Sequence, residues 1–258
     1  MSVLIPSDGS HQIVARKTRV DRRRYFQSTG PAGLSTFVNA IGVALLATYD
    51  GRIGVTSSAG VVSNWADARG SVGFGPALTA AGTAQPSYNG SNKLTFDGVN
   101  NVMSTAAAYA GFDVSTPLAF FFIGFSAAAG NFAGVSDSSS ASRILLLQNA
   151  SGVYAANAGN PHTTVSSVIA SDSTELLVVV SSGASAGNID VPNRARVSSA
   201  ITMPAAGANF LTLGSYFASG AGKVACTAFA CGVLSRVPTA GDLTALAAYA
   251  QALGATLQ

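Results

Sequence analysis

Short apolar runs separated by turn residues are the feature that most limits the fold of this 258-residue chain. Two of these runs, residues 118–123 and 176–180, are apolar throughout. A short continuous apolar run between turn signals is typical of a strand that is buried on both faces. Gly, Asn, Asp and Ser punctuate the remaining runs, which is the rhythm of antiparallel β structure. The pattern predicts an all-β fold in which one sheet packs on another.

The predicted strands are residues 43–49, 61–65, 93–96, 118–125, 144–148, 152–156, 164–170, 176–181, 195–197, 210–215 and 223–234. One segment has helical spacing instead. Thr239 and Asp242 form a variant of the capping box, which marks a helix start. An apolar stripe at spacings of three and four follows and predicts a short C-terminal helix laid on the sandwich: Leu243, Leu246, Ala250, Leu253 and Leu257.

Charge is concentrated near the N-terminus. Charged residues make up 10% of the chain, against about 25% in typical soluble proteins. Six of the basic residues fall within nine positions: Arg16, Lys17, Arg19, Arg22, Arg23 and Arg24. Asp21 is the one acidic residue among them, and the aromatic residues Tyr25 and Phe26 follow. We therefore predict an extended basic arm over residues 1–30 and one folded domain over residues 31–258.

The basic arm and the low charge of the domain indicate that the protein binds partners. A surface with so little charge has weak protection against association, so we expect neighbouring subunits to cover part of it, as in a homo-oligomer. A basic segment can order on an acidic groove of another protein subunit. Nucleic acid is a weaker candidate because no nucleic-acid-binding fold accompanies the arm. A solvated tail without a specific partner is the remaining alternative.

The two cysteines, Cys226 and Cys231, lie in one predicted strand. Their odd spacing places them on opposite faces, about 17 Å apart at the rise of a strand. A disulfide needs Cα atoms within about 7 Å, so we predict two buried free thiols. No apolar run reaches the roughly 18 residues of a membrane span, and residues 1–12 lack the pattern of a secretory signal.

Several short motifs occur in a recognisable order: Trp65-x-Asp67-x-x-Gly70, the Gln-Pro-Ser-Tyr sequence at 85–88, and residues 93–101, 211–214 and 233–239. This order resembles concanavalin A-like (laminin-G-like) jelly-roll domains, including those of bacteriophage virion proteins. The resemblance covers residues 34–258. It implies an antiparallel two-sheet jelly roll in which Phe96 fills the core and Asp97-Gly98 makes a tight turn.

The resemblance also implies a function. We expect a structural protein of the virion of a tailed bacteriophage, a capsid decoration or a tail or fibre component, made in the host cytoplasm. Its arm would dock on other virion proteins, and its lectin-like domain would be displayed, with host surface glycans as a further partner. Trp65 and Tyr88 are the candidate glycan contacts, although Trp65 also fits a buried anchor whose N–H finds a partner.

No cofactor is expected. Related domains often bind calcium through loop oxygens, and two loops offer such atoms: Asp97, Asn100 and Asn101 in one, Asn188, Asp190 and Asn193 in the other. Turns use the same residue types for conformational reasons, which is the favoured reading.

Enzymatic activity is not expected. The same resemblance includes glycoside hydrolases, which need two carboxylates roughly 5–9 Å apart. The chain has a single glutamate, Glu175, and no alternating pair of acids on a predicted strand. Its two histidines, His11 and the loop residue His162, are far apart in sequence, which leaves little material for a metal site or a triad. A free carbohydrate-binding lectin module and a divergent glycosidase are the alternative functions.

Overall fold

The computed structural model describes residues 30–69, 75–126, 128–137, 144–150, 153–159, 162–170, 176–215, 217–220 and 222–255. Its helical elements are α2 (Leu34–Ile41), η1 (Gly42–Ala44), η2 (Gly82–Ala84) and α3 (Ala240–Ala252). Its strands are β1 (Leu45–Asp50), β2 (Val55–Ser58), β3 (Val61–Trp65), β4 (Leu78–Thr79), β5 (Ser87–Tyr88), β6 (Leu94–Asp97), β7 (Met103–Thr105), β8 (Leu118–Phe125), β9 (Gly130–Ser136), β10 (Ile144–Ala150), β11 (Val153–Gly159), β12 (His162–Ala170), β13 (Leu176–Ser182), β14 (Ala186–Asp190), β15 (Val197–Ala200), β16 (Phe210–Leu213) and β17 (Ala225–Leu234). None of the described helices is long and apolar enough to cross a bilayer.

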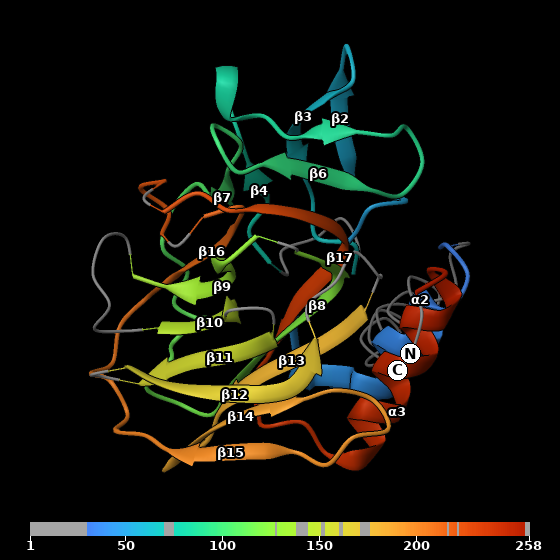
Figure 1. Ribbon diagram of the computed structural model, residues 1–258. Coiled ribbons are helices and arrows are strands. Elements are labelled where there is room, and N and C mark those ends of the chain that lie inside the picture. The colour runs from blue at the N-terminus through green and yellow to red at the C-terminus, as the bar shows by residue number, and fades with distance from the viewer. Residues whose placement is uncertain are drawn as a thin grey trace, which may run out of the picture.

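The strands pair antiparallel in one continuous sheet that contains two runs (Figure 1). In the first run, β1 and β6 pair with different parts of β17, and β8, β13, β14 and β15 follow. The second run is β2, β3, β4, β7, β16, β9, β10, β11 and β12. β5 pairs with β3 and with β6 and so joins the two runs. Because β11 and β12 contact β14, the runs face each other, as expected for an all-β sandwich.

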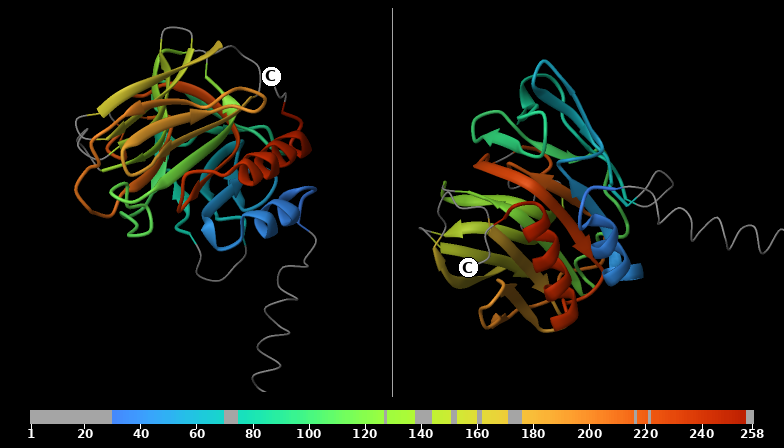
Figure 2. Two further views of the ribbon diagram at one scale, coloured as in Figure 1. Left: turned by 90° about the horizontal axis from the view of Figure 1, so that it is seen from below. Right: turned by 90° about the vertical axis from the view of Figure 1, so that its right-hand side faces the viewer.

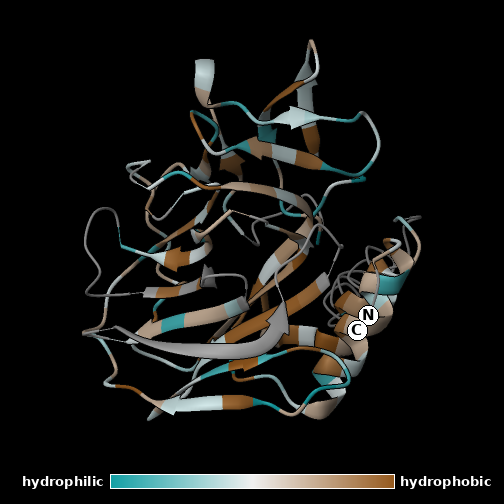
Figure 3. Ribbon diagram, viewed as in Figure 1, coloured by the Kyte–Doolittle hydropathy of each residue, from teal (hydrophilic) through white to brown (hydrophobic). Residues whose placement is uncertain are grey.

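Strand β8 shows how the sheet is covered on both faces. Leu118, Phe120 and Phe122 point into the core between the two runs. Phe121 and Ile123 belong to a second core, beneath α2 and α3. The predicted burial of this strand on both faces is therefore confirmed. Helices cover its outer face, however, where sheet-on-sheet packing was expected (Figure 2). Figure 3 shows apolar residues along the central strands and on the helices that pack there.

Helix α2 was not predicted from the sequence. Its four buried residues repeat at helical spacing: Leu34, Phe37, Val38 and Ile41. The phenyl ring of Phe37 stacks on Tyr249 of α3 with ring centroids 4.6 Å apart. Gly33, at the N-terminus of α2, has φ 82°, and a Cβ there would lie 2.6 Å from the Cβ of Ala252. Glycine at this position is thus what allows the two helices to approach.

Helix α3 begins as predicted. The Thr239 hydroxyl accepts from the amide of Asp242 at 3.2 Å, and the Asp242 carboxylate accepts from the amide of Thr239 at 2.9 Å. The guanidinium of Arg236 donates to the same carboxylate at 2.6 Å. The helix ends at Ala252, and Leu257 lies outside the described residues.

The two cysteines are free and buried, as predicted, but their assignment to opposite faces was wrong. Both side chains belong to the core between the runs. The register of β17 against β8 shifts between Ala228 and Ala230, which marks a β-bulge. One extra residue converts the odd spacing into an even one, so Cys226 and Cys231 return to the same face.

Candidate functional site

Trp65 and Tyr88, the residues predicted to contact glycans, lie in different environments. Trp65 has an exposed fraction of 0%, and its indole N–H donates to the carbonyl of Asp50 at 3.0 Å. It is the buried anchor, and the hypothesis that it stacks on a sugar is wrong because neither face of the ring is accessible. Tyr88 is half-buried and donates its hydroxyl to the carbonyl of Gly51 at 2.8 Å. Burial and the charge of Asp50 raise the pKa of Tyr88, which therefore stays protonated. Its role as a glycan contact remains a prediction.

Asp67, from the Trp-x-Asp motif, ties three segments together. Its carboxylate accepts from the amides of Thr48 and Gly75, at 3.1 and 2.7 Å. It also pairs with Arg69 at 2.7 Å. The Arg69 guanidinium in turn donates to the carbonyls of Leu45 and Leu46. This motif therefore fixes the loop after β3 against β1 and serves the fold.

The first loop with candidate calcium ligands is a turn closed by its own backbone. One oxygen of Asp97 accepts from the amides of Val99, Asn100 and Asn101 at 2.8–2.9 Å. Burial alone would raise the pKa of Asp97, but the hydrogen bonds from Asn101, Asn100 and Val99 outweigh it and lower that pKa. Gly98 has φ 73°, and a Cβ there would lie 2.7 Å from the amide nitrogen of Ala225. The predicted turn at Asp97-Gly98 is confirmed.

In the second loop with candidate calcium ligands, the polar groups bond to residues of neighbouring strands. Asn188 donates to Ser181 at 3.2 Å and accepts from Ser198 at 2.7 Å. Asp190 pairs with Arg196 at 2.7 Å, and the exposed Asn193 has a left-handed backbone with φ 64°. Within the residues that the structure describes, no cluster of three or more His, Cys, Asp or Glu side chains is placed to hold a metal ion.

Asp50 is a fully buried carboxylate at the end of β1. Arg52 binds it through two nitrogens, with Nε 2.9 Å from Oδ1 and Nη2 2.6 Å from Oδ2, and the Tyr249 hydroxyl donates to Oδ2 at 2.8 Å. The other terminal nitrogen of Arg52 donates to the carbonyls of Ala32 and Ala252 at 3.1 and 3.2 Å. The pair therefore joins the sheet to the ends of both helices.

Six described carboxylates share this structural use, each bound to an arginine or to backbone amides: Asp50, Asp67, Asp97, Asp113, Asp190 and Asp242. A glycosidase needs one carboxylic acid that stays protonated beside another that is ionised. The pKa values of Asp97 and Asp242 are instead lowered: burial opposes the shift in both, and the amide bonds at Asp97 and the Arg236 and Thr239 bonds at Asp242 outweigh it. These six carboxylates hold the fold.

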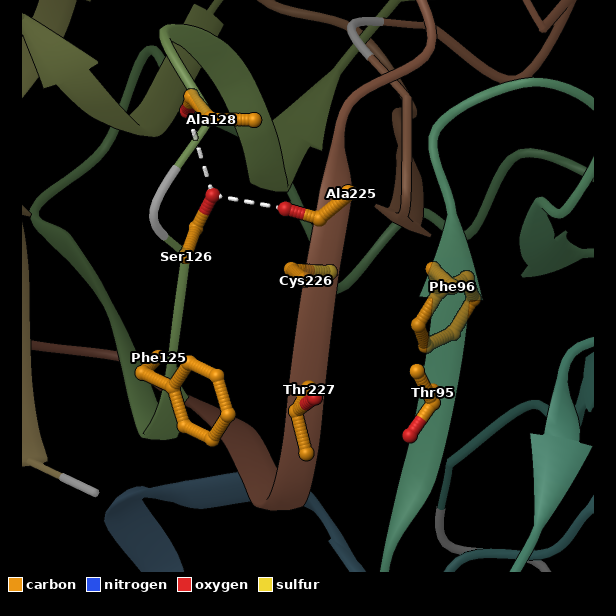
Figure 4. Close-up of a pocket in the computed structure, with 8 residues that line it drawn as sticks. All are labelled: Thr95, Phe96, Phe125, Ser126, Ala128, Ala225, Cys226 and Thr227. Carbon is orange, nitrogen blue, oxygen red and sulfur yellow. Dashed lines mark hydrogen bonds between the residues drawn. The ribbon is translucent and has the colours of Figure 1, made fainter. Parts of the chain in front are cut away.

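A groove of about 370 Å³ is lined by residues of β6, β17 and β8 and of the segment that follows β8 (Figure 4). Thr95, Thr227 and Phe125 are aligned across the three strands by the register of the sheet. Ser126 closes one end, where its hydroxyl donates to the carbonyls of Ala225 and Ala128 at 2.7 and 3.2 Å. With that hydroxyl engaged internally, the groove offers mainly apolar surface: Phe96, Phe125, Ala128, Ala225 and Cys226.

A second depression, of about 490 Å³, lies between loops at one end of the sandwich, and we call it the loop cleft. It is lined by Thr79, Ala80, Ala81, Thr83, Ala84, Asn100, Val102, Ser104, Ala218, Ser219, Gly220 and Lys223. Its walls are tied together by the amide of Asn101, which donates to the carbonyl of Gln85 at 2.9 Å, and by the Val102 amide, which donates to Ala84 at the same distance. The loop cleft is therefore a formed feature of the fold.

The polar side chains of the loop cleft differ from those of the groove. Thr79 donates its hydroxyl to the carbonyl of Ser104 at 3.3 Å. The side chains of Thr83, Asn100, Ser219 and Lys223 have no hydrogen-bond partner within the part of the chain that the structure describes. The lining of the loop cleft thus combines these polar side chains, which lack a described partner, with small residues such as alanine and glycine. None of its residues except Asn100 was singled out from the sequence.

Lys223 lines the loop cleft, and Ala225, two residues later at the start of β17, lines the groove. The arm residues predicted to bind a partner lie outside the described residues: Arg16, Lys17, Arg19, Arg22, Arg23, Arg24, Tyr25 and Phe26. His162, expected in a loop, instead begins β12.

No protein-family model and no curated protein matches this chain. Solved structures do. An arabinofuranosidase complexed with arabinofuranosyl-alpha-1,2-xylobiose aligns with a TM-score of 0.58 and 12% identity over 84% of this chain and 64% of that one. The binding domain of Botulinum neurotoxin serotype D aligns with a TM-score of 0.57 and 8% identity over 83% of this chain and 53% of that one.

Trypanosoma rangeli sialidase aligns with a TM-score of 0.52 and 13% identity over 93% of this chain and 38% of that one. The chain therefore spans between 38% and 64% of the length of these three structures. At such identities the likeness shows the fold alone: a β-sandwich of the kind found in these glycosidases and this toxin binding domain.

Proposed function

We propose that this protein is a non-enzymatic glycan-binding protein whose β-sandwich, of jelly-roll type, presents the loop cleft to a saccharide. The observation that carries the proposal is the set of hydroxyl, amide and ammonium groups that line the loop cleft and have no hydrogen-bond partner among the described residues. Specific sites orient a ligand through a few well-placed polar groups on a pre-formed concave surface. A sugar offers the hydroxyl groups that such donors and acceptors would pair with.

The small residues of the loop cleft fit the same ligand. Ala80, Ala84, Ala218 and Gly220 leave room for a ring to approach the polar groups closely. The cleft walls are held by backbone and side-chain hydrogen bonds, so little ordering is needed on binding. A pre-organised site loses less free energy on association than a mobile one.

The use of the carboxylates supports binding without catalysis. The six acids described above are engaged by arginines and backbone amides, and none of them lines the loop cleft. General acid catalysis of glycoside cleavage needs a carboxyl group whose pKa is raised. The lowered pKa values of Asp97 and Asp242 oppose that role.

The place of the protein in a virion is a second part of the proposal. Its support is the sequence: a segment with six cations in nine residues precedes a domain of low charge, and the motif order resembles phage-borne jelly rolls. In this role the arm docks on an acidic surface of another virion protein, and the sandwich displays the loop cleft outward.

A saccharide array with a blocked variant tests glycan binding. Ala81→Trp places an indole at the exposed rim of the loop cleft, and Ala195→Trp places the same group on an exposed loop between β14 and β15. We expect the wild-type protein and Ala195→Trp to bind the same saccharides and Ala81→Trp to lose them. Equal binding by both variants, or release of reducing ends by the wild-type protein, would contradict the proposal.

Sedimentation tests the virion role. Particles purified from the source should carry the wild-type protein, and the triple variant with Arg22, Arg23 and Arg24 changed to Gln should be depleted from them. A protein that remains free of particles while still binding saccharides would be a free lectin module.

A further inference from the structure

We infer that the saccharide held in the loop cleft is acidic, with one carboxylate placed against the ammonium group of Lys223. This inference rests on the proposed function, because it names the class of glycan that the same cleft selects. The observation behind it is the charge of the lining: among its described residues Lys223 is the only ionisable side chain, and the other polar groups are neutral.

Lys223 has no counter-ion among the residues that the structure describes. The ion pairs of the described residues use Arg52, Arg69, Arg196 and Arg236. Lys223 is exposed and forms no ion pair or hydrogen bond among the described residues. In a chain with so few charges, a cation at the wall of a cleft that has no partner among the described residues is available to a ligand.

The position of Lys223 suits a bound anion. Its aliphatic chain runs beside Gly220, where an added Cβ would lie 3.7 Å from Cε of the lysine. That separation is an ordinary van der Waals distance, so the lysine stem lies alongside the backbone of Gly220, another lining residue of the cleft. Asn100, Ser219 and Thr83 line the same cleft and can donate to ring hydroxyls or to the second carboxylate oxygen.

The other described lysine, Lys93, has a contact partner and lies outside the loop cleft. Lys93 lies 5.5 Å from the ring centroid of Phe229, in a cation–π contact, and does not line the loop cleft. It carries the same charge in the same domain, so its substitution changes net charge without touching the site. Lys93→Gln is therefore the matched control for Lys223→Gln.

The experiment is isothermal titration of the full chain with three pairs of probes. Each pair is an oligosaccharide of galacturonic, glucuronic or N-acetylneuraminic acid and its own methyl ester, which keeps the sugar and removes the charge. We expect at least one acid to bind about three- to fivefold more tightly than its ester at low salt, because an ion pair with an exposed lysine contributes up to about that much. The preference should shrink at 0.5 M salt, where screening is strong.

Three variants test whether Lys223 causes the preference for the acid over the ester. Lys223→Gln should bind acid and ester equally, Lys223→Arg should retain the preference, and Lys93→Gln should behave as the wild-type protein. A preference that survives Lys223→Gln would overturn the assignment to Lys223. Equal binding of acid and ester by the wild-type protein would overturn the inference while leaving glycan binding intact. Failure of all six probes, with neutral saccharides bound on the array, would also overturn it. A silent array would instead defeat the proposed function.

Discussion

Removing the guanidinium that pairs with Asp50 should destabilise the whole fold. In Arg52→Ala the Asp50 carboxylate, 0% exposed, would keep the Tyr249 hydroxyl and the amide of residue 52 but lose its cation. Breaking a buried pair by removing one partner costs about 3–5 kcal/mol. The Arg52 side chain is 18% exposed, so water can replace part of the loss, and we expect about 3 kcal/mol.

Urea unfolding followed by tryptophan fluorescence measures this change, because the single tryptophan, Trp65, donates to the carbonyl of Asp50 and lies in the core. Arg194→Ala, in the exposed loop between β14 and β15, removes the same charge and should change the free energy of unfolding by less than about 0.5 kcal/mol. Arg52→Lys should fall between them, since lysine keeps the charge and loses the two-pronged geometry. A loss below about 1 kcal/mol in Arg52→Ala would refute the assigned role of the pair.

Three further results are expected. Gly33→Ala should lower the free energy of unfolding by more than about 1 kcal/mol in a urea titration, because the added Cβ would clash with Ala252 and the backbone has positive φ; an unchanged midpoint would contradict the close approach of the helices. A thiol-specific reagent at pH 8 should label the folded protein far more slowly than the unfolded one, since burial raises the pKa of Cys226 to about 12 and that of Cys231 well above its ordinary value; equal rates would place the thiols outside the core. The pKa of Asp97 is lowered in the fold, so its stabilising contribution is complete above the pKa of the unfolded state and is lost as the pH falls through the folded value. Asp97→Asn should therefore flatten the decline in the free energy of unfolding below about pH 4. An unaltered acid profile would exclude this contribution.

The continuous apolar runs made the central strands predictable. Residues 118–125 coincide with β8, because a strand buried on both faces leaves a strong local signal. Residues 61–65 coincide with β3, which is only partly buried. Helix α2 also has a local signal, the helical spacing of Leu34, Phe37, Val38 and Ile41. This signal was missed because glycines flank the segment and because its apolar run continues into β1. The faces of the cysteines depended on a β-bulge, which the residue spacing does not reveal.

The loop cleft could not be predicted from the sequence. Its walls come from three segments that are far apart in the chain: 79–84, 100–104 and 218–223. Most of its residues are alanine, serine, threonine and glycine, which occur throughout the chain and carry no catalytic or metal-binding pattern. Trp65 was easier to single out as a candidate from the sequence. Its large aromatic ring suits sugar stacking and burial equally well, and in the structure it is fully buried.

Mapping amide chemical shifts during titration of the ¹⁵N-labelled full chain with a saccharide found on the array tests the central claim most directly. The account predicts shifts that saturate and cluster on the loop cleft, at Thr83, Asn100, Ser104 and Ser219, with the saccharide recovered intact. Shifts confined to the groove at Thr95 and Phe125, or cleavage of the saccharide in the tube, would contradict it.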